Sequence, residues 1–166
     1  MLKGIDSRIN ADLVYVLAAM GHGDKIAIVD RNYPATFDAR SSRLVRYDGV
    51  NSIEMLKMIL TLMPLDTFVD SPVFTMQVVD KPDEILPFHK EGQEICSQVE
   101  GRDVSVTSLE RSDFYDRVRS CFAIVSTSED RPYGNLILVK GVLEPRTMAL
   151  AHLPVTLNLT LIEACL

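Results

Sequence analysis

The chain has 166 residues, enough for one domain with a substantial hydrophobic core. Hydrophobic residues make up 47% of it and charged residues 24%, which is typical of a globular domain; the net charge of −6, without a basic cluster, excludes a nucleic-acid partner. No apolar run reaches the roughly 18 residues that cross a bilayer, and the first residues show no apolar signal segment. We therefore expect a cytoplasmic protein with no membrane partner.

Predicted helices and strands alternate in the first half of the chain. Asn10 can cap a helix whose apolar residues recur at i, i+3, i+4 and i+7, with Gly21 as its terminating glycine. The apolar run 25–29 predicts a buried strand. Residues 52–63 predict a second helix that stops before a proline, and residues 73–79 predict a second strand.

The second half continues the alternation. A helix is expected from about residue 87 to residue 99, with proline in its first turn, and another over 112–120. Strands are expected at 104–109, 122–127 and 136–142. This alternation predicts the α/β class, as a three-layer α/β/α sandwich with a mixed, mainly parallel sheet.

Three cysteines and three histidines are scattered along the chain. They are Cys96, Cys121, Cys165, His22, His89 and His152. Their spacing matches neither a disulfide framework nor a metal site. Phosphate-binding, dinucleotide-binding and Gly-x-Ser-x-Gly motifs are also missing from the sequence. We therefore expect no metal and no cofactor.

The segment MGHGDKIAIVD, residues 20–30, holds a histidine between two glycines. An imidazole exchanges protons near neutral pH, and the glycines allow unusual backbone geometry around His22. The alternative is an ordinary loop after a helix-ending glycine. Asp30 follows a buried strand, at the edge where α/β sheets bind ligands, although it is equally suited to start a turn.

A second group of polar residues precedes the last predicted strand. Tyr133 and Asn135 flank Gly134, and both side chains can donate and accept hydrogen bonds, as binding of a hydroxyl group requires. The alternative is a hairpin turn with a packed tyrosine.

Several motifs together, in this order, resemble the ribose pyranase and fucose mutarotase family over about residues 2–143. They are Met20-Gly21-His22-Gly23-Asp24, Asp30, Arg46-Tyr47-Asp48-Gly49, MPLDTFVDSP from Met63 to Pro72, Arg111-x-x-Phe114-Tyr115-x-Arg117, Tyr133-Gly134-Asn135 and Lys140-Gly141-Val142. The Gly-His-Gly form and Asn32-Tyr33-Pro34 are more similar to the fucose branch than to the ribose branch.

The resemblance implies an isomerase that interconverts sugar anomers without cofactor or metal. It places the proton-donating histidine on His22, and the substrate-binding residues on Asp30, Arg111 and the segment Tyr133-Gly134-Asn135. Asp30 would either bind a sugar hydroxyl or fix the tautomer of the histidine. L-fucose or a related monosaccharide is the expected substrate. A ribose-type pyranase and a non-catalytic monosaccharide-binding module are the alternatives.

Two departures from the family pattern bear on substrate identity. Lys25 stands where the family often has glutamate, which reverses a charge near the expected site. The family's Thr-Gly-Glu is replaced here by residues 127–129, Thr-Ser-Glu, and this change can alter a backbone turn.

The positions of His22 and Asp30 raise a geometric problem. In a straight strand, Asp24 and Asp30 lie about 20 Å apart, at ~3.3 Å per residue. The two site residues therefore share a pocket only if the glycine loop folds back, or if neighbouring subunits complete the site. The resemblance implies ring-shaped homo-oligomers with sites near subunit interfaces, which favours the second solution.

Residues 1–143 are expected to form a single mutarotase-like domain, and 144–166 a C-terminal extension. In the extension, Val155, Leu157, Leu159 and Leu161 alternate with polar residues. This pattern predicts an added amphipathic strand, and the alternative is an extension with no role in the site.

Overall fold

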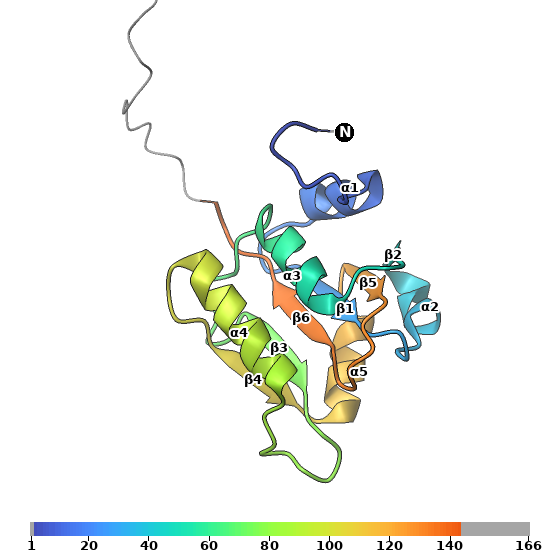
Figure 1. Ribbon diagram of the computed structural model, residues 1–166, viewed down its shortest axis with the longest axis vertical. Coiled ribbons are helices and arrows are strands. Elements are labelled where there is room, and N and C mark those ends of the chain that lie inside the picture. Colours follow the sequence, from blue (N-terminus) through green and yellow to red (C-terminus); the bar gives the residue numbers. More distant parts are fainter. Residues whose placement is uncertain (1, 144–166) are drawn as a thin grey trace, which may run out of the picture.

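A six-stranded sheet of order β2-β5-β1-β6-β3-β4 lies at the centre of the computed structural model, which describes residues 2–143 (Figure 1). The strands are β1 Lys25–Val29, β2 Arg43–Tyr47, β3 Val73–Met76, β4 Val106–Leu109, β5 Ala123–Thr127 and β6 Leu136–Val139. Strand β6 runs antiparallel to both of its neighbours, β1 and β3, and the other pairs are parallel. The predicted mixed, mainly parallel sheet is confirmed, whereas the strand predicted at 155–161 lies outside the described residues.

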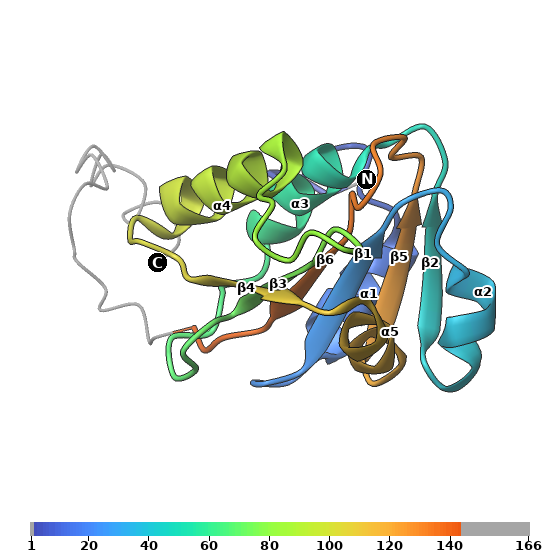
Figure 2. The ribbon, with the colours of Figure 1, turned by 90° about the horizontal axis from the view of Figure 1, so that it is seen from below.

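Helices cover both faces of this sheet. They are α1 Ala11–Ala19, α2 Ala35–Asp38, α3 Ser52–Leu60, α4 Pro87–Glu100 and α5 Arg111–Arg119, with a 3₁₀ turn η1 at Ala39–Ser41. Helices α1, α3 and α4 contribute to one hydrophobic core, and α2 and α5 to the other. Figure 2 shows α3 and α4 on one side of the sheet and α5 on the opposite side. The three-layer architecture is therefore confirmed.

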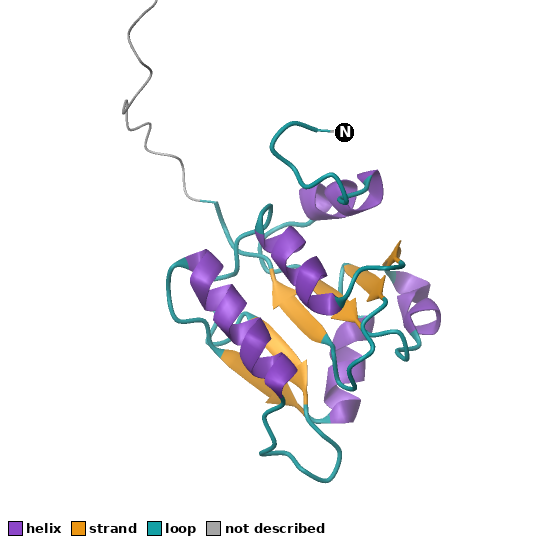
Figure 3. Ribbon diagram, viewed as in Figure 1, coloured by secondary structure: helices purple, strands orange, loops and turns teal. Residues whose placement is uncertain are grey.

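The two cores follow from the alternation of side chains along the central strand. In β1, Ile26 and Ile28 belong to the first core, while Ala27 and Val29 belong to the second. All four are fully buried, because helices pack on both faces of the strand. Figure 3 shows the strands between their covering helices.

Several predicted boundaries differ from the structure. Helix α3 ends at Leu60 rather than at residue 63, and β3 ends at Met76, after which the chain leaves the sheet. Strand β2 was not predicted. It is an edge strand in which Arg43 and Arg46 are exposed, so its sequence lacks the apolar run of a central strand.

The antiparallel pairing of β1 and β6 determines where the site residues lie. The carboxyl end of β1 meets the amino end of β6, which brings Asp30 to Asn135. At the opposite edge, the amino end of β1 meets the carboxyl end of β6, and the amide of Gly23 donates to the Lys140 carbonyl at 2.9 Å. The sheet therefore has two separate edges at which predicted site residues gather.

Candidate functional site

Asp30 and Asn135 form a reciprocal pair at the carboxyl end of β1. The backbone N–H of Asp30 donates to Asn135 Oδ1 at 2.8 Å, and Asn135 Nδ2 donates to Asp30 Oδ2 at 2.8 Å. The amide of Asn32 donates to the other carboxylate oxygen of Asp30 at 2.9 Å, so this residue also starts the turn that the sequence allowed. Both side chains are buried and fixed, yet a carboxylate has about four acceptor positions and the amide nitrogen a second N–H. The pair can therefore still bind sugar hydroxyls.

Tyr133 adopts a strained backbone conformation beside this pair. Its φ of 61° lies in the left-handed region, which non-glycine residues enter at a cost of roughly 1–3 kcal/mol, commonly at functional sites. Its hydroxyl accepts a hydrogen bond from the amide of Val79 at 3.3 Å. The next residue must be glycine, because a Cβ on Gly134 would lie 2.4 Å from Glu129 Cγ and 3.0 Å from the Arg131 carbonyl oxygen.

The turn over residues 131–135 is not a hairpin, so that alternative interpretation was wrong. Strand β1 lies between β5 and β6 in the sheet, and the chain crosses its carboxyl end to reach β6. This crossover brings Asn135 back beside Asp30, and a local turn between paired strands would not do so.

Arg111, the first residue of α5, lies across the loop that follows β3. With Glu110 and this loop it lines a hollow of about 280 Å³. Val79 belongs to the same loop, and its amide donates to the hydroxyl of Tyr133. Arg111 is exposed, so its guanidinium is available to a ligand. The loop after β3 thus connects the arginine to the tyrosine.

An aromatic pair that sequence reasoning did not assign lies next to Arg111. The rings of Tyr33 and Tyr115 stack with centroids 4.8 Å apart, and the Arg111 guanidinium carbon lies 5.6 Å from the Tyr115 ring centroid. The hydroxyl of Tyr33 donates to Asp38 at 2.7 Å, and Arg119 donates to the other oxygen of Asp38 at 3.0 Å. Burial, with the hydrogen bond to Asp38, raises the pKa of Tyr33 well above its ordinary value. Tyr33 is therefore a neutral, fixed support for the second ring.

His22 lies at the other edge of the sheet, against a carboxylate that the sequence did not single out. Its Nε2 is 3.1 Å from Asp66 Oδ1, and its ring contacts Phe68 edge-on, with centroids 5.5 Å apart. Burial alone would raise the pKa of Asp66. Hydrogen bonds from the Phe68 amide and from His22 outweigh that effect and hold this pKa below its ordinary value.

This contact assigns the tautomer of the histidine. Because Asp66 is ionised near neutral pH, the neutral imidazole carries its proton on Nε2 to donate to it, and Nδ1 is left free. Half of the His22 side chain is exposed, so Nδ1 can reach a ligand. Asp66, and not Asp30, is therefore the carboxylate that orients His22. The signal in the sequence was the MPLDTFVDSP segment, quoted above without a role for its aspartate.

The loop around His22 is held in place by Lys140. The ammonium group donates to two carbonyl groups at the end of α1, at 2.7 and 2.6 Å, and the lysine carbonyl accepts from Gly23. Gly23 has a φ of 83°, the left-handed conformation that glycine favours. Gly21 follows the C-cap residue Met20, so its predicted place at the end of the helix is confirmed, although the left-handed glycine is Gly23, two residues further along.

His22 and Asp30 therefore do not meet within one chain. Strand β1 runs between them, and the glycine loop is bound to Lys140 at the amino edge instead of folding back. A strand of this length separates its two ends by roughly 3.3 Å per residue. The folded-back loop is wrong, and completion of the site by a neighbouring subunit stays a prediction.

The two departures from the family pattern lie at opposite edges of the sheet, Lys25 at the amino end of β1 and Ser128 directly after the carboxyl end of β5. Lys25 lines a surface hollow with Asp113 and Asp116 of α5, which complement its charge. Ser128 stands where the family has a glycine, and its own φ is not left-handed. Its hydroxyl oxygen accepts from the amide of Gly49 at 2.8 Å.

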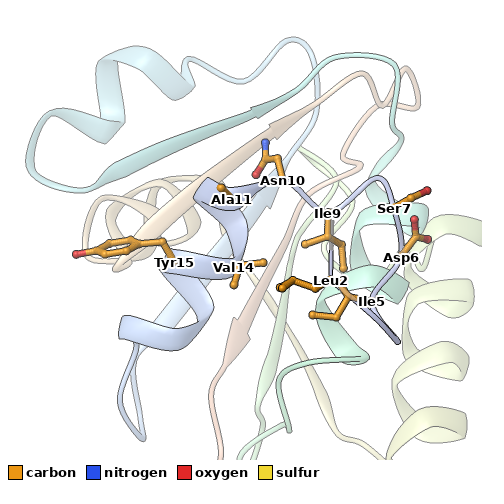
Figure 4. A pocket seen from close by; sticks show the side chains of 9 residues that line it. All are labelled: Leu2, Ile5, Asp6, Ser7, Ile9, Asn10, Ala11, Val14 and Tyr15. Atoms are coloured by element: carbon orange, nitrogen blue, oxygen red, sulfur yellow. The ribbon is translucent and has the colours of Figure 1, made fainter.

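A larger hollow of about 560 Å³ lies between the N-terminal segment and α1 (Figure 4). It is lined by Leu2, Ile5, Asp6, Ser7, Ile9, Asn10, Ala11, Val14 and Tyr15. This lining is mostly apolar and includes none of the six predicted site residues. We therefore assign it no part in the chemistry.

The described residues also limit which other reactive groups are present. Between residues 2 and 143, no group of three or more His, Cys, Asp or Glu side chains is arranged to hold a metal ion. Burial raises the pKa of the Cys96 and Cys121 thiols to about 12, so neither is a thiolate nucleophile near neutral pH. None of the helices in this part of the chain is long and apolar enough to cross a bilayer.

The protein is thus an α/β domain with a buried aspartate–asparagine pair at one edge of its sheet and a carboxylate-oriented histidine at the other. Residues 3–143 match the model of the RbsD / FucU transport protein family, and the chain belongs to this family. The family resemblance seen in the sequence is confirmed.

Relatives of this chain carry more specific names. The human protein named fucose mutarotase is 39% identical over 146 residues, which cover 86% of this chain and 94% of that protein. The structure of FucU from Bifidobacterium longum is 37% identical, with a TM-score of 0.81 over 86% of this chain and all of that one. The Streptococcus pneumoniae fucose mutarotase, solved in complex with L-fucose, is 42% identical and superimposes with a TM-score of 0.76 over 86% of this chain and all of that one.

Proposed function

We propose that this protein is a fucose mutarotase, which interconverts the α and β anomers of L-fucose or a closely related monosaccharide. The observation that carries the proposal is the presence of these site groups in a chain that is 39% identical to the human fucose mutarotase and 42% identical to the Streptococcus pneumoniae one. A histidine oriented by a buried carboxylate supplies a proton carrier. The Asp30–Asn135 pair supplies hydroxyl-binding groups.

His22 is the proton donor in this proposal. Ring opening of a sugar requires a proton on the ring oxygen and loss of the anomeric hydroxyl proton, as the bond between the anomeric carbon and the ring oxygen breaks. Closure on the other face of the carbonyl inverts the anomer and returns both protons. Asp66 contacts Nε2 and orients the imidazole, so Nδ1 is the atom that donates the proton and takes it back.

The remaining groups hold the sugar. Asp30 and Asn135 bind adjacent hydroxyls through their unused acceptor and donor positions. Arg111 donates to a further hydroxyl from the start of α5. The left-handed turn at Tyr133 directs this ring to the loop after β3, where it closes one side of the site. All of these contacts are to hydroxyl groups, which suits a neutral monosaccharide.

A complete site in this proposal needs two copies of the chain in a homo-oligomer. His22 and the Asp30–Asn135 pair lie at opposite ends of β1, so each group lacks the other within one chain. Beside His22, the side chains of Phe68 and Val69 are 76% and 42% exposed, which supplies apolar surface for a contact between subunits. The cytoplasmic location stays a prediction.

Saturation-transfer NMR on equilibrated sugars tests the proposed activity directly. Irradiating the α-anomer proton should reduce the β-anomer signal of L-fucose at catalytic protein concentrations, and D-ribose should respond more weakly. A stronger response with D-ribose would instead support a ribose-type pyranase. Binding without faster exchange on either sugar would support a sugar-binding module, and would contradict the proposed enzyme.

A further inference from the structure

Glu129 is a buried carboxylate outside the groups described above. Its side chain is 1% exposed, and all of its hydrogen-bond donors come from two residues. Oε1 accepts from the backbone N–H and Nε of Arg131, at 3.1 and 2.7 Å. Oε2 accepts from Nη2 of Arg131 at 2.8 Å and from the Ser52 amide, at the first turn of α3, at 3.1 Å. A buried carboxylate with four donors is fixed in one orientation.

One side of this carboxylate determines the position of the turn before Asn135. Gly134 packs so closely on the Glu129 side chain that no Cβ fits between them. The Ser52 hydroxyl donates to the Gly134 carbonyl at 2.7 Å, and the Gly134 amide donates to the Arg131 carbonyl at 3.2 Å, so the residue preceding Asn135 is held by two neighbours of the carboxylate. Arg131, which starts the turn, is bound to the carboxylate directly.

The same short segment also holds the chain on both sides of Asp30. The backbone carbonyl of Glu129 accepts from the amide of Arg31 at 3.2 Å. Thr127, two residues earlier, donates its hydroxyl to the Val29 carbonyl at 2.9 Å and accepts from the Glu129 amide at 3.2 Å. The residues before and after Asp30 are therefore bound to the segment that carries Glu129.

We propose that Glu129 is a positioning residue of the sugar site, which fixes the Asp30–Asn135 pair from both sides without contacting the sugar. This inference rests on the proposed function for its sugar readout, but its structural basis is independent of the substrate. Burial alone would raise the pKa of the Glu129 carboxyl, and the hydrogen bonds from Arg131 outweigh burial and hold this pKa below its ordinary value. The carboxylate therefore stays charged near neutral pH.

The chain offers a matched control for this role. Nη1 of Arg131 donates to Glu91 at 3.0 Å, so two carboxylates share one guanidinium. The Glu91 side chain is 45% exposed, and it accepts from the outer Nη1 of Arg131, whereas Glu129 accepts from the Arg131 backbone and from Ser52. Glu129→Gln and Glu91→Gln thus each remove one negative charge beside the same arginine, and only the first replaces an acceptor oxygen of the buried hydrogen bonds behind Gly134 by a donor.

Calorimetric titration with L-fucose and NMR exchange rates test the inference. Because a misplacement of ~1 Å in a site can cost about 10²-fold in rate, Glu129→Gln should weaken sugar affinity about tenfold and slow exchange at saturating sugar at least as much. Its binding stoichiometry should be unchanged. Glu91→Gln should leave affinity and rate within about twofold of the unaltered protein. A folded Glu129→Gln variant with unaltered affinity and rate would overturn the proposal. Reduced stoichiometry at unaltered affinity would also overturn it, because that result indicates that part of the protein is unfolded and the rest binds normally.

Two further measurements cover the remaining outcomes. If Glu129→Gln does not fold, Ser52→Ala removes only the hydroxyl that holds Gly134, and a smaller loss of affinity is expected, whereas unaltered affinity would overturn the proposal. Hydrogen–deuterium exchange measured by mass spectrometry reads the positioning without any sugar. Segments 29–32 and 131–136 should exchange faster in Glu129→Gln than in Glu91→Gln. If the unaltered protein does not speed the interconversion of sugar anomers, the proposed function is refuted. If the two segments exchange amide hydrogens equally fast in the two variants, the positioning role is refuted.

Discussion

At the scale of single residues, the structure places the proposed proton carrier and the proposed sugar-binding pair at opposite ends of β1. His22 is half exposed and touches one buried carboxylate, so its environment is suited to proton transfer more than to packing. Asp30 and Asn135 have the opposite environment, because both side chains are buried and hydrogen-bonded to each other. Substitutions at the two places should therefore differ in what they change.

His22→Ala should slow anomer exchange by roughly 10²- to 10⁴-fold, the usual contribution of a general acid or base. Its thermal unfolding temperature should stay close to that of the unaltered protein, since the ring is half exposed and leaves no large cavity. NMR exchange and thermal unfolding of the same sample check both statements. Unaltered exchange in the folded variant would remove His22 from the mechanism, and an unfolded variant would contradict the minor packing role of its ring.

Asp66→Asn should reduce stability in a way that depends on pH. The pKa of Asp66 in the folded protein lies below its ordinary value of 3.8, so the ionised carboxylate stabilises the fold above that value. This contribution is lost as the pH falls through the lowered pKa. Urea unfolding should show the full difference in free energy of unfolding between the two proteins at neutral pH, and a smaller one near pH 3.

The same difference at both pH values would mean that Asp66 keeps the same proton occupancy in the folded and unfolded chains. Anomer exchange should also fall in Asp66→Asn, because an amide can bind either tautomer of His22 and no longer selects the proton on Nε2.

At the scale of secondary-structure elements, periodicity predicted most of the fold because most elements bury an apolar face. The cap at Asn10, the run Lys25–Val29 and the proline at the start of α4 all carried local signals that the structure confirms. Strand β2 was not predicted, because its exposed arginines interrupt the apolar run that marks a buried strand. Long-range contacts were beyond such signals: the pairing of Asp66 with His22 joins residues 44 positions apart, and no local pattern encodes it.

Two glycines in different elements should respond oppositely to alanine. Gly134→Ala forces a Cβ against Glu129 Cγ and backbone, so the free energy of unfolding should fall by about 1–3 kcal/mol, and exchange should slow because Asn135 moves. Gly92→Ala is the control, because it lies inside α4 and its Cβ would find ordinary contacts at 3.7 Å or more. Its free energy of unfolding should rise by roughly 0.5–1 kcal/mol. Urea unfolding measures both, and equal effects would contradict the packing described.

At the scale of the whole molecule, all six predicted site residues lie in the part of the chain that matches the family, residues 3–143. Truncation after Leu143 should therefore preserve anomer exchange per chain. NMR exchange, with sedimentation to compare assembly, checks this expectation. A truncated protein that folds and assembles like the full chain but loses exchange would place part of the site in residues 144–166.

The sequence could not resolve how the site is completed, because a subunit interface leaves no periodic signal within one chain. It did predict the difficulty, since an extended strand between His22 and Asp30 keeps them apart. The structure places His22 and the Asp30–Asn135 pair at opposite edges of one sheet, and completion of the site by a second subunit stays a prediction.

Mixing two variants, each altered in one of the two proposed groups of site residues, tests this account most directly. His22→Ala retains the sugar-binding half-site, and Asn135→Ala retains the proton carrier. The two proteins are unfolded together, refolded as a mixture and assayed for L-fucose anomer exchange, with each variant refolded alone as the control. If sites form between chains, random mixing should restore up to about a quarter of the unaltered rate per site, because that fraction of sites combines two intact halves. A mixture that assembles but remains as inactive as its components would contradict a site shared between subunits.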